Sequence, residues 1–249
     1  MPCLGYTADM QNSLDTIGTR WHFVRDVEQL VSQALSQVAR AAQQALQARG
    51  AFHLVLSGGT TPQALYARLH TLDTDWRKWH VWFGDERCLP AHDTARNSQM
   101  AWSSWLHDSP IPAQQIHLIP AELGAEAAAE AYTQKLSEIG LFDLVLLGLG
   151  EDGHTASLFP GHAWGTCPDS AAVLAVHDAP KPPADRVSLS AQRLSQARAV
   201  LFLVAGAGKR DAVAAWRRGE PIAAAAIRLE SGVDVLLEQI CVTPHEDQK

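Results

Sequence analysis

The stretch FDLVLLGLGEDGHTASLFPG, residues 142–161, indicates how the chain folds. It opens with an unbroken apolar run, residues 144–147, which is typical of a strand buried on both faces in a parallel sheet. A glycine-rich turn follows that carries two carboxylates and a histidine, namely Glu151, Asp152 and His154. Residues 155–159 then predict a short helix before Pro160. Open α/β proteins place their chemistry on such turns, at the carboxyl ends of buried strands.

On both sides of this stretch, apolar strands alternate with amphipathic helices. We expect strands at residues 21–24, 52–56, 79–83, 116–119, 144–147, 172–176, 186–189, 199–204 and 233–237. We expect helices at residues 26–49, 62–70, 97–106, 122–139 and 209–218. This alternation predicts a parallel or mixed sheet covered by helices on both faces. Because no long linker interrupts it, we expect a single domain over residues 1–249, in which residues 1–20 form a mobile N-terminal segment.

The composition of the 249-residue chain narrows the classes of function. The formal net charge of −7 argues against a broad nucleic-acid surface, so an anion would need a local cluster of basic side chains and backbone N–H groups. No apolar run approaches the roughly 20 residues that span a bilayer, and residues 1–20 lack the apolar core of a signal peptide. We therefore expect a cytoplasmic protein without nucleic-acid or membrane partners.

Residues 148–153, GLGEDG, match the G-x-G-x-x-G pattern of dinucleotide-binding proteins, but the acidic side chains argue against that function. Glu151 and Asp152 would repel a pyrophosphate at the start of the following helix. One alternative is a plain strand-to-helix turn capped by Asp152. We favour a catalytic turn, because the glycine between Asp152 and His154 allows the carboxylate to orient the imidazole. The helix N-terminus would keep that imidazole neutral and able to accept a proton.

The turn SGGTTP, residues 57–62, has the composition of an anion site between a strand and a helix. Its glycines allow a ligand to approach the backbone, and its hydroxyls and the free N–H groups of the first helical turn can bind a phosphate. Thr61 is expected to cap the helix and Pro62 to begin it. The alternative is a well-capped turn that binds nothing.

Three basic side chains lie at or near the ends of other predicted strands. Lys209 lies where a helix is expected to begin, a place where a cation is unfavourable unless an anion is nearby. Arg87 ends a strand beside two carboxylates, and Arg186 begins a strand. A solvent-exposed lysine and a surface ion pair at Arg87 are the alternatives. In a doubly wound fold, however, the loops that carry these residues share one edge of the sheet with His154.

Together these stretches resemble the 6-phosphogluconolactonase family, a relative of the glucosamine-6-phosphate deaminases. The matching motifs are SGGTTP (57–62), FGDER (83–87), Asn97, GLGEDGHTASLFPG (148–161), RVSLS (186–190) and GAGK (206–209), in the family's order. The resemblance implies a Rossmann-like, doubly wound α/β fold with a mostly parallel sheet (NagB/RpiA/CoA-transferase-like). It also implies hydrolysis of 6-phospho-D-glucono-1,5-lactone to 6-phospho-D-gluconate in the oxidative pentose phosphate pathway, without a metal or another cofactor.

By the same resemblance, His154 would be the general base and Asp152 its partner. The residues that would bind the substrate and its phosphate are Ser57, Gly58, Gly59, Thr60, Thr61, Arg87, Arg186 and Lys209. The small-molecule lactone would be the ligand of a monomer or small homo-oligomer.

The chemistry of lactone hydrolysis suits these residues. A neutral imidazole can take the proton of the attacking water, and the developing oxyanion would be stabilised by backbone N–H groups of the glycine turn or by Arg87. Two other functions use the same pocket. One is a deaminase or isomerase of amino-sugar phosphates, and the other is a regulator that binds a phosphosugar without catalysis.

Overall fold

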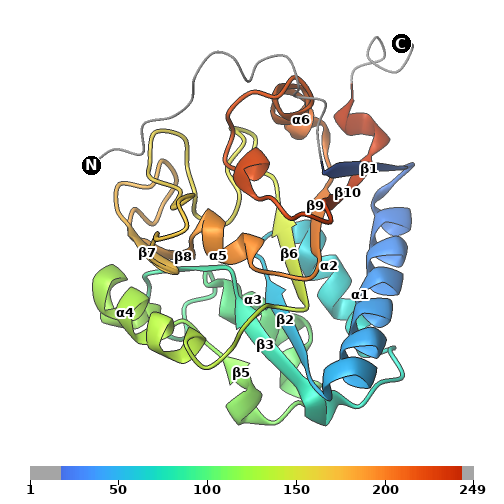
Figure 1. Cartoon of the computed structure of the whole chain (residues 1–249), viewed down its shortest axis with the longest axis vertical. Coiled ribbons are helices and arrows are strands. Elements are labelled where there is room, and N and C mark those ends of the chain that lie inside the picture. The colour runs from blue at the N-terminus through green and yellow to red at the C-terminus, as the bar shows by residue number, and fades with distance from the viewer. Residues whose placement is uncertain (1–17, 243–249) are drawn as a thin grey trace.

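The computed structural model describes residues 18–242 and contains one large parallel sheet with helices on both faces (Figure 1). Its strands are β1 (Thr19–Val24), β2 (Phe52–Leu56), β3 (Trp79–Phe83), β5 (Ile116–His117), β6 (Leu144–Gly148), β9 (Val200–Val204) and β10 (Val233–Glu238). Their order in the sheet is β1-β10-β9-β6-β2-β3-β5, and every neighbouring pair is parallel. The predicted doubly wound α/β fold is confirmed.

The strand order reverses between β2 and β6, which are hydrogen-bonded neighbours. The chain continues from β2 to β3 and β5 on one side, and from β6 to β9 and β10 on the other. In doubly wound sheets the loops at such a reversal part in opposite directions and leave a crevice for ligands. The loops that follow β2 and β6 begin at Ser57 and Leu149, and both were singled out from the sequence.

The helices are α1 (Val27–Arg49), α2 (Thr60–Leu69), α3 (Asn97–Ser104), α4 (Ala125–Leu136), α5 (Ala191–Ser195) and α6 (Arg210–Arg217). In α1 the Asp26 carboxylate accepts the N–H of Gln29 at 2.8 Å, and Gly50 ends the helix with a φ of 76°. In Figure 1, α2 and α3 lie behind the large sheet and α5 lies in front of it. Helix α6 packs the ring of Trp216 edge-on against Trp21 and Phe202.

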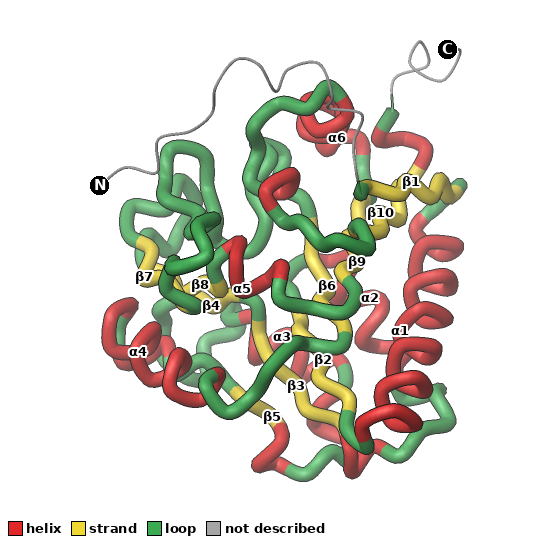
Figure 2. The backbone as a smooth tube through the Cα atoms, in the orientation of Figure 1, coloured by secondary structure: helices red, strands yellow, loops and turns green. Residues whose placement is uncertain are grey.

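A second sheet of three antiparallel strands lies beside the first (Figure 2). It consists of β4 (Asp85–Arg87), β8 (Arg186–Leu189) and β7 (Val173–Val176), with β8 in the middle. Strand β4 directly follows β3, so this small sheet begins at the carboxyl end of a strand of the large one. The joint is Gly84, whose N–H donates to the Leu56 carbonyl at 2.9 Å and whose carbonyl accepts the Leu189 N–H at 2.8 Å. Helix α4 packs against β7 and β8.

Some predicted boundaries shift. Residues 19 and 20 belong to β1 and pair with Val233 and Asp234, so they are not part of a mobile segment. The expectation for residues 1–17 lies outside the described residues. The helix predicted over residues 122–139 is shorter, because Gly124, with a φ of 88°, separates a 3₁₀ turn from α4. Among residues 18–242, no helix combines the length and the apolarity needed to cross a membrane.

Candidate active site

The turn after β6 holds Asp152 and His154 in a fixed relation. The Gly150 N–H donates to the His154 carbonyl at 2.7 Å, and the Gly153 N–H donates to the Gly150 carbonyl at 3.1 Å. Within this frame, Nδ1 of His154 is hydrogen-bonded to the Asp152 carboxylate, which also accepts the His154 backbone N–H at 3.2 Å. A Cβ atom on Gly150 would lie 2.1 Å from Nδ1 of His154, so only glycine leaves room for this pair.

The pairing decides which nitrogen of the imidazole is available. Because an ionised carboxylate can only accept, Nδ1 carries the proton and Nε2 is left as the acceptor. Partial burial raises the pKa of Asp152, but the side-chain hydrogen bond from His154, the charge interaction with that ring and the backbone hydrogen bonds together hold this pKa below its usual value. Asp152 is therefore ionised near neutral pH. The His154 side chain is 20% exposed, so a small molecule can reach the ring.

The helix predicted over residues 155–159 does not form, and that prediction is wrong. Ala156 has a φ of 48°, and the Leu158 N–H turns back to the Thr155 carbonyl at 3.0 Å, so the chain makes a second tight turn. The predicted helix therefore offers no N-terminus to His154, and the expectation that this helix would keep the imidazole neutral loses its basis. Orientation by Asp152 does not depend on that helix.

Phe159, at the end of this turn, brings the imidazole next to a basic residue. The ring centroids of His154 and Phe159 are 4.7 Å apart. The guanidinium carbon of Arg186 lies 5.4 Å from the centroid of the same Phe159 ring. Phe159 is buried, with 1% of its surface exposed, so the two groups share a fixed aromatic neighbour. As predicted, the side chains of His154 and Arg186 lie near each other at one edge of the sheet.

Arg87 and Arg186 are directly opposed in the register of β4 and β8. Like charges at opposed positions destabilise a sheet, and an anion between them would remove that cost. Burial lowers the pKa of Arg186, and Arg87 adds to this effect, although Asp85 opposes it. The carbonyls of residues 181–183 accept hydrogen bonds from Arg186. Arg87 donates to the Ala95 carbonyl, and its Nε is buried without a hydrogen-bond partner in the part of the chain that the structure describes.

The turn of residues 57–61 follows β2, and the turn that carries Asp152 and His154 (residues 150–158, called the histidine turn) follows the neighbouring strand β6. A Cβ atom on Gly148 would lie 4.0 Å from the Gly58 carbonyl oxygen, so the two loops are neighbours. The Tyr66 hydroxyl bonds to both the N–H and the carbonyl of Ser57 at 2.9 Å. The Ser57 hydroxyl is buried and finds no hydrogen-bond partner within residues 18–242. Leaving a buried hydroxyl unpaired costs about 1–3 kcal/mol, which a bound oxyanion would offset.

Helix α2 begins earlier than predicted. Gly59 precedes its first residue with a φ of 112°, a conformation that favours glycine, and no side chain caps the helix. Thr61 is thus inside the first turn and does not cap it, and Pro62 is the third residue and not the first. Thr60 and Thr61 lie in the first turn, where backbone N–H groups have no partner inside the helix. Although α2 begins two residues earlier than predicted, the turn can still bind an anion, and the chain bends at Gly59.

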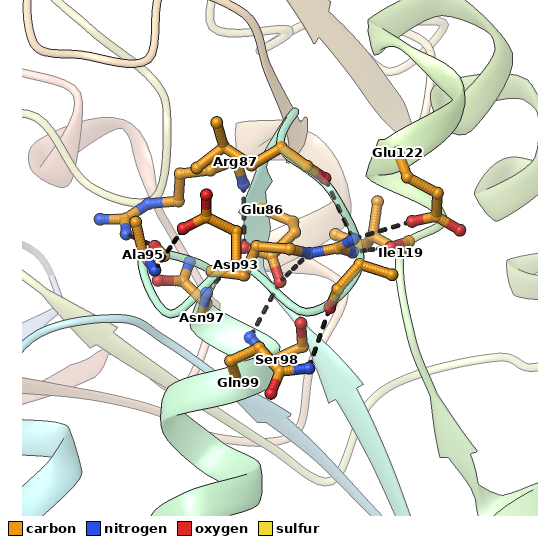
Figure 3. Close-up of polar contacts among 12 residues, drawn as sticks. Glu86, Arg87, Asp93, Ala95, Asn97, Ser98, Gln99, Ile119 and Glu122 are labelled. Carbon is orange, nitrogen blue, oxygen red and sulfur yellow. Dashed lines mark hydrogen bonds and ion pairs between the residues drawn. The ribbon is translucent and has the colours of Figure 1, made fainter.

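Glu86 fixes the segment that carries Arg87, as Figure 3 shows. Its buried carboxylate accepts the N–H groups of Asn97 at 2.7 Å and Ser98 at 2.8 Å, and so caps α3 from outside the helix. It also accepts the N–H of Arg87 at 2.9 Å. The guanidinium of Arg96, which is 2% exposed, lies 3.4 Å from the same carboxylate. A negative charge buried in this way needs such partners, and together they hold the backbone of Arg87 in place.

Lys209 lies on the loop next to the histidine turn. It ends a 3₁₀ turn, Ala207–Lys209, directly before α6. A Cβ atom on Gly208 would lie 2.7 Å from a carboxylate oxygen of Glu151, so this loop touches the turn that carries His154. The Lys209 side chain is half-buried. The structure therefore places Lys209 beside the cluster, without a hydrogen bond from its side chain to any other predicted site residue among those described.

Sequence reasoning missed several residues that hold the site together. Asp85, Ser157 and Phe159 lie inside motifs that were recognised, yet nothing in their spacing gave them a role. Two hollows, of about 300 and 520 Å³, lie at the opposite edge of the sheet, and none of the predicted site residues lines them. Among the described residues, no group of three or more His, Cys, Asp or Glu side chains is arranged to hold a metal ion.

Comparison with known proteins agrees with this architecture. Residues 25–235 match the family model described as glucosamine-6-phosphate isomerases/6-phosphogluconolactonase. A 6-phosphogluconolactonase of Mycobacterium bovis is 38% identical over 204 residues, which cover 76% of this chain and 82% of that protein. The chain is also 38% identical to a GDH/6PGL endoplasmic bifunctional protein of Oryctolagus cuniculus, over 74% of this chain but only 24% of that longer protein.

The fold agrees as well. The crystal structure of 6-phosphogluconolactonase from Thermotoga maritima superimposes with a TM-score of 0.82 at 25% identity, over 89% of this chain and all of that one. The family match spans the strands from β2 to β9 and the loops between them. This chain belongs to the family of glucosamine-6-phosphate isomerases and 6-phosphogluconolactonases, and within that family it is related to the 6-phosphogluconolactonases.

Proposed function

We propose that this protein is a 6-phosphogluconolactonase, which hydrolyses 6-phospho-D-glucono-1,5-lactone to 6-phospho-D-gluconate. Its family and its curated relatives support this activity. The observation that carries the proposal is the Phe159 ring, which has the imidazole of His154 and the guanidinium of Arg186 as neighbours. A proton acceptor and a cation thus lie at one edge of the sheet, as hydrolysis of a phosphorylated lactone requires.

His154 is the general base of the proposed reaction. Its Nε2 takes a proton from water as that water attacks the lactone carbonyl, an effect typically worth about 10²- to 10⁴-fold in rate. Asp152 holds the ring through Nδ1 and stabilises the imidazolium that forms. The bond from the carbonyl carbon to the ring oxygen then breaks, and the imidazolium returns its proton to that oxygen. No electrons are transferred, so the reaction needs no redox cofactor.

The N–H groups of Gly150, Gly153 and His154 are already engaged within the turn. The donor for the developing oxyanion therefore comes from outside these three groups. With Arg87 assigned to the phosphate in this proposal, that donor is another backbone N–H group or another side chain.

The phosphate of the substrate lies between the opposed arginines and the turn of residues 57–61 in this proposal. Arg87 and Arg186 supply the charge, and the unpaired Ser57 hydroxyl and the first turn of α2 supply hydrogen bonds. Lys209 approaches from the neighbouring loop. Binding energy from the phosphate then orients the lactone carbonyl toward His154. We also propose that the protein acts in the cytoplasm as a monomer or small homo-oligomer, with no nucleic-acid or membrane partner.

The activity is tested by generating the lactone in situ and following its disappearance with and without the purified chain. The proposal predicts hydrolysis well above the spontaneous rate for the phosphorylated lactone, and slower hydrolysis of glucono-1,5-lactone. Ammonia release from glucosamine 6-phosphate would instead support a deaminase. Tight binding of 6-phospho-D-gluconate without hydrolysis above the spontaneous rate would support a phosphosugar-binding regulator and contradict the proposal.

A further inference from the structure

Two neighbouring cross-strand pairs of the small sheet lie on one face. Asp85 is opposed to Ser188, and Arg87 is opposed to Arg186. Positions two residues apart along a strand point to the same face and are separated by about 7 Å. The first pair therefore lies beside the arginine pair on that face, at a distance set by the backbone.

The histidine turn is seated on the first pair through Ser157. The Ser157 hydroxyl donates to an Asp85 carboxylate oxygen at 2.7 Å. The Ser157 backbone N–H donates to the Ser188 hydroxyl at 3.2 Å. Ser157 and Ser188 are both 0% exposed and Asp85 is 5% exposed, so water does not compete for these bonds. Ser157 lies only three residues after His154, on the same double turn.

The other oxygen of Asp85 reaches toward the turn of residues 57–61. It accepts from the side-chain amide of Asn97 at 3.0 Å. The carbonyl oxygen of that amide lies 2.1 Å from where a Cβ atom on Gly58 would stand, so Asn97 packs directly on the turn. The buried Asp85 carboxylate is thus hydrogen-bonded both to Ser157 of the histidine turn and to Asn97, which contacts the turn of residues 57–61.

We propose that Ser157 and Asp85 are positioning residues that set the distance between the base and the arginine pair. Neither needs to touch the substrate. Ser157 fixes the histidine turn to Asp85 of β4. The pairing of β4 with β8 then holds Arg87 and Arg186 at a constant distance from Asp85, and so from the histidine turn. This inference rests on the proposed function, because the distance matters only if one substrate spans both groups.

Kinetic constants of Ser157→Ala test the inference. Without the Ser157–Asp85 hydrogen bond the histidine turn can shift, while Arg87, Arg186 and the turn of residues 57–61 stay in place. We expect kcat to fall about 10- to 100-fold, since small misplacements of a catalytic group have effects of that size. KM for the phosphorylated lactone should stay within about twofold, because ground-state binding of the phosphate is unchanged. Ser157→Cys, which retains a weak donor, should give an intermediate kcat.

Ser190→Ala is the matched control. Ser190 is also 0% exposed, and its hydroxyl caps α5 by accepting the Arg193 N–H at 3.2 Å, a bond that does not involve the histidine turn. Its loss should lower the melting temperature without changing kcat. The inference is overturned if Ser157→Ala retains the wild-type kcat, if it raises KM and leaves kcat unchanged, or if Ser190→Ala loses as much kcat. A wild-type chain without lactonase activity would instead overturn the proposed function.

Discussion

The molecule contains two kinds of histidine environment, and their difference separates structure from chemistry. His53, His80 and His117 lie in adjacent strands of the large sheet, where the rings of His53 and His80 stack with centroids 4.6 Å apart. The ring of His117 stacks on Trp82 with centroids 3.7 Å apart. His154 instead lies on a turn at the edge of the sheet and has a carboxylate partner.

The sheet histidines are held neutral by their surroundings. Burial lowers the pKa of both His53 and His117 to about 4, with a smaller contribution from His80, and burial also lowers the pKa of His80. Nδ1 of His53 already accepts the Trp82 indole N–H at 3.2 Å. His154 differs because Asp152 occupies one nitrogen and can stabilise a positive charge on the ring. Compared with the sheet histidines, His154 is the candidate base because it has a carboxylate partner on one nitrogen and a second nitrogen left open at the edge of the sheet.

The largest expected effect is that of His154→Ala. The variant should lose about 10²- to 10⁴-fold in kcat, because the proton acceptor for the attacking water is removed. Steady-state hydrolysis of the in-situ lactone, corrected for the spontaneous rate, measures this loss. Near-normal turnover would remove His154 from the mechanism and abolish the contrast with the sheet histidines.

Gly150→Ala should come next. The new Cβ would lie 2.1 Å from Nδ1 of His154 and 2.6 Å from the Asp152 carboxylate, so the pair must separate. We expect kcat to fall about 10- to 100-fold. The control is Gly50→Ala, at a position with a φ of 76° and no atom within 4 Å, which should cost about 1 kcal/mol of stability and leave kcat unchanged. A Gly150→Ala variant with normal kcat would show that the pair is not needed.

Arg87→Ala should raise KM about 10- to 100-fold, the equivalent of one or two lost charge-assisted hydrogen bonds to a phosphate. Initial rates over a range of lactone concentrations separate KM from kcat. The matched control is Arg77→Ala, because Arg77 forms a surface ion pair with Asp75 and its side chain is 79% exposed. An unchanged KM in Arg87→Ala, or an equal rise in Arg77→Ala, would contradict the assignment of the phosphate to Arg87.

The smallest effect concerns stability and the sheet histidines. Because the pKa of His53 is about 4 in the folded protein and about 6.5 when unfolded, the folded state binds fewer protons between these values. Stability should therefore fall as pH drops from 6.5 toward 4. Among the charged and titratable groups that act on the pKa of His53, His80 adds most to the lowering, Asp143 opposes it, and Arg193 and Arg49 add to it.

His53→Asn tests this dependence, since the amide oxygen can still accept from Trp82. Its melting temperature should depend less on pH between 6.5 and 4 than that of the wild type, while kcat near neutral pH stays unchanged. A pH dependence identical to that of the wild type would show that His53 does not titrate in this way.

The large sheet could be predicted from the sequence because its strands are short apolar runs separated by amphipathic helices, which are local signals. The small sheet could be predicted only in part: the strands expected over residues 172–176 and 186–189 are confirmed as β7 and β8, but their pairing with β4 in a second sheet was not predicted. Strand β4 consists of Asp85, Glu86 and Arg87, which carry no apolar pattern, and its partner β8 lies far along the chain. The opposition of Arg87 and Arg186 is therefore a product of tertiary pairing.

Within the site, the Asp152–His154 pair could be predicted because the glycine between them allows a tight turn that brings the carboxylate to the imidazole. The false helix over residues 155–159 has a local cause. Ala156 and Leu158 favour a helix, and only the folded structure reveals otherwise, since Ser157 is bonded to Asp85 and Ala156 takes a positive φ. The contacts of the Phe159 ring with His154 and Arg186 likewise could not be predicted locally, because Arg186 lies on β8, a separate part of the chain.

Calorimetric binding of 6-phospho-D-gluconate, measured beside turnover, tests the central claim most directly. The account predicts opposite patterns for two variants. His154→Ala should bind this product with nearly the wild-type affinity and hydrolyse almost nothing, whereas Arg87→Ala should bind it weakly and retain most of kcat at saturating lactone. Equal losses of binding and turnover in both variants, or efficient turnover by His154→Ala, would contradict the claim that the general base and the phosphate-binding residues are separate parts of one site.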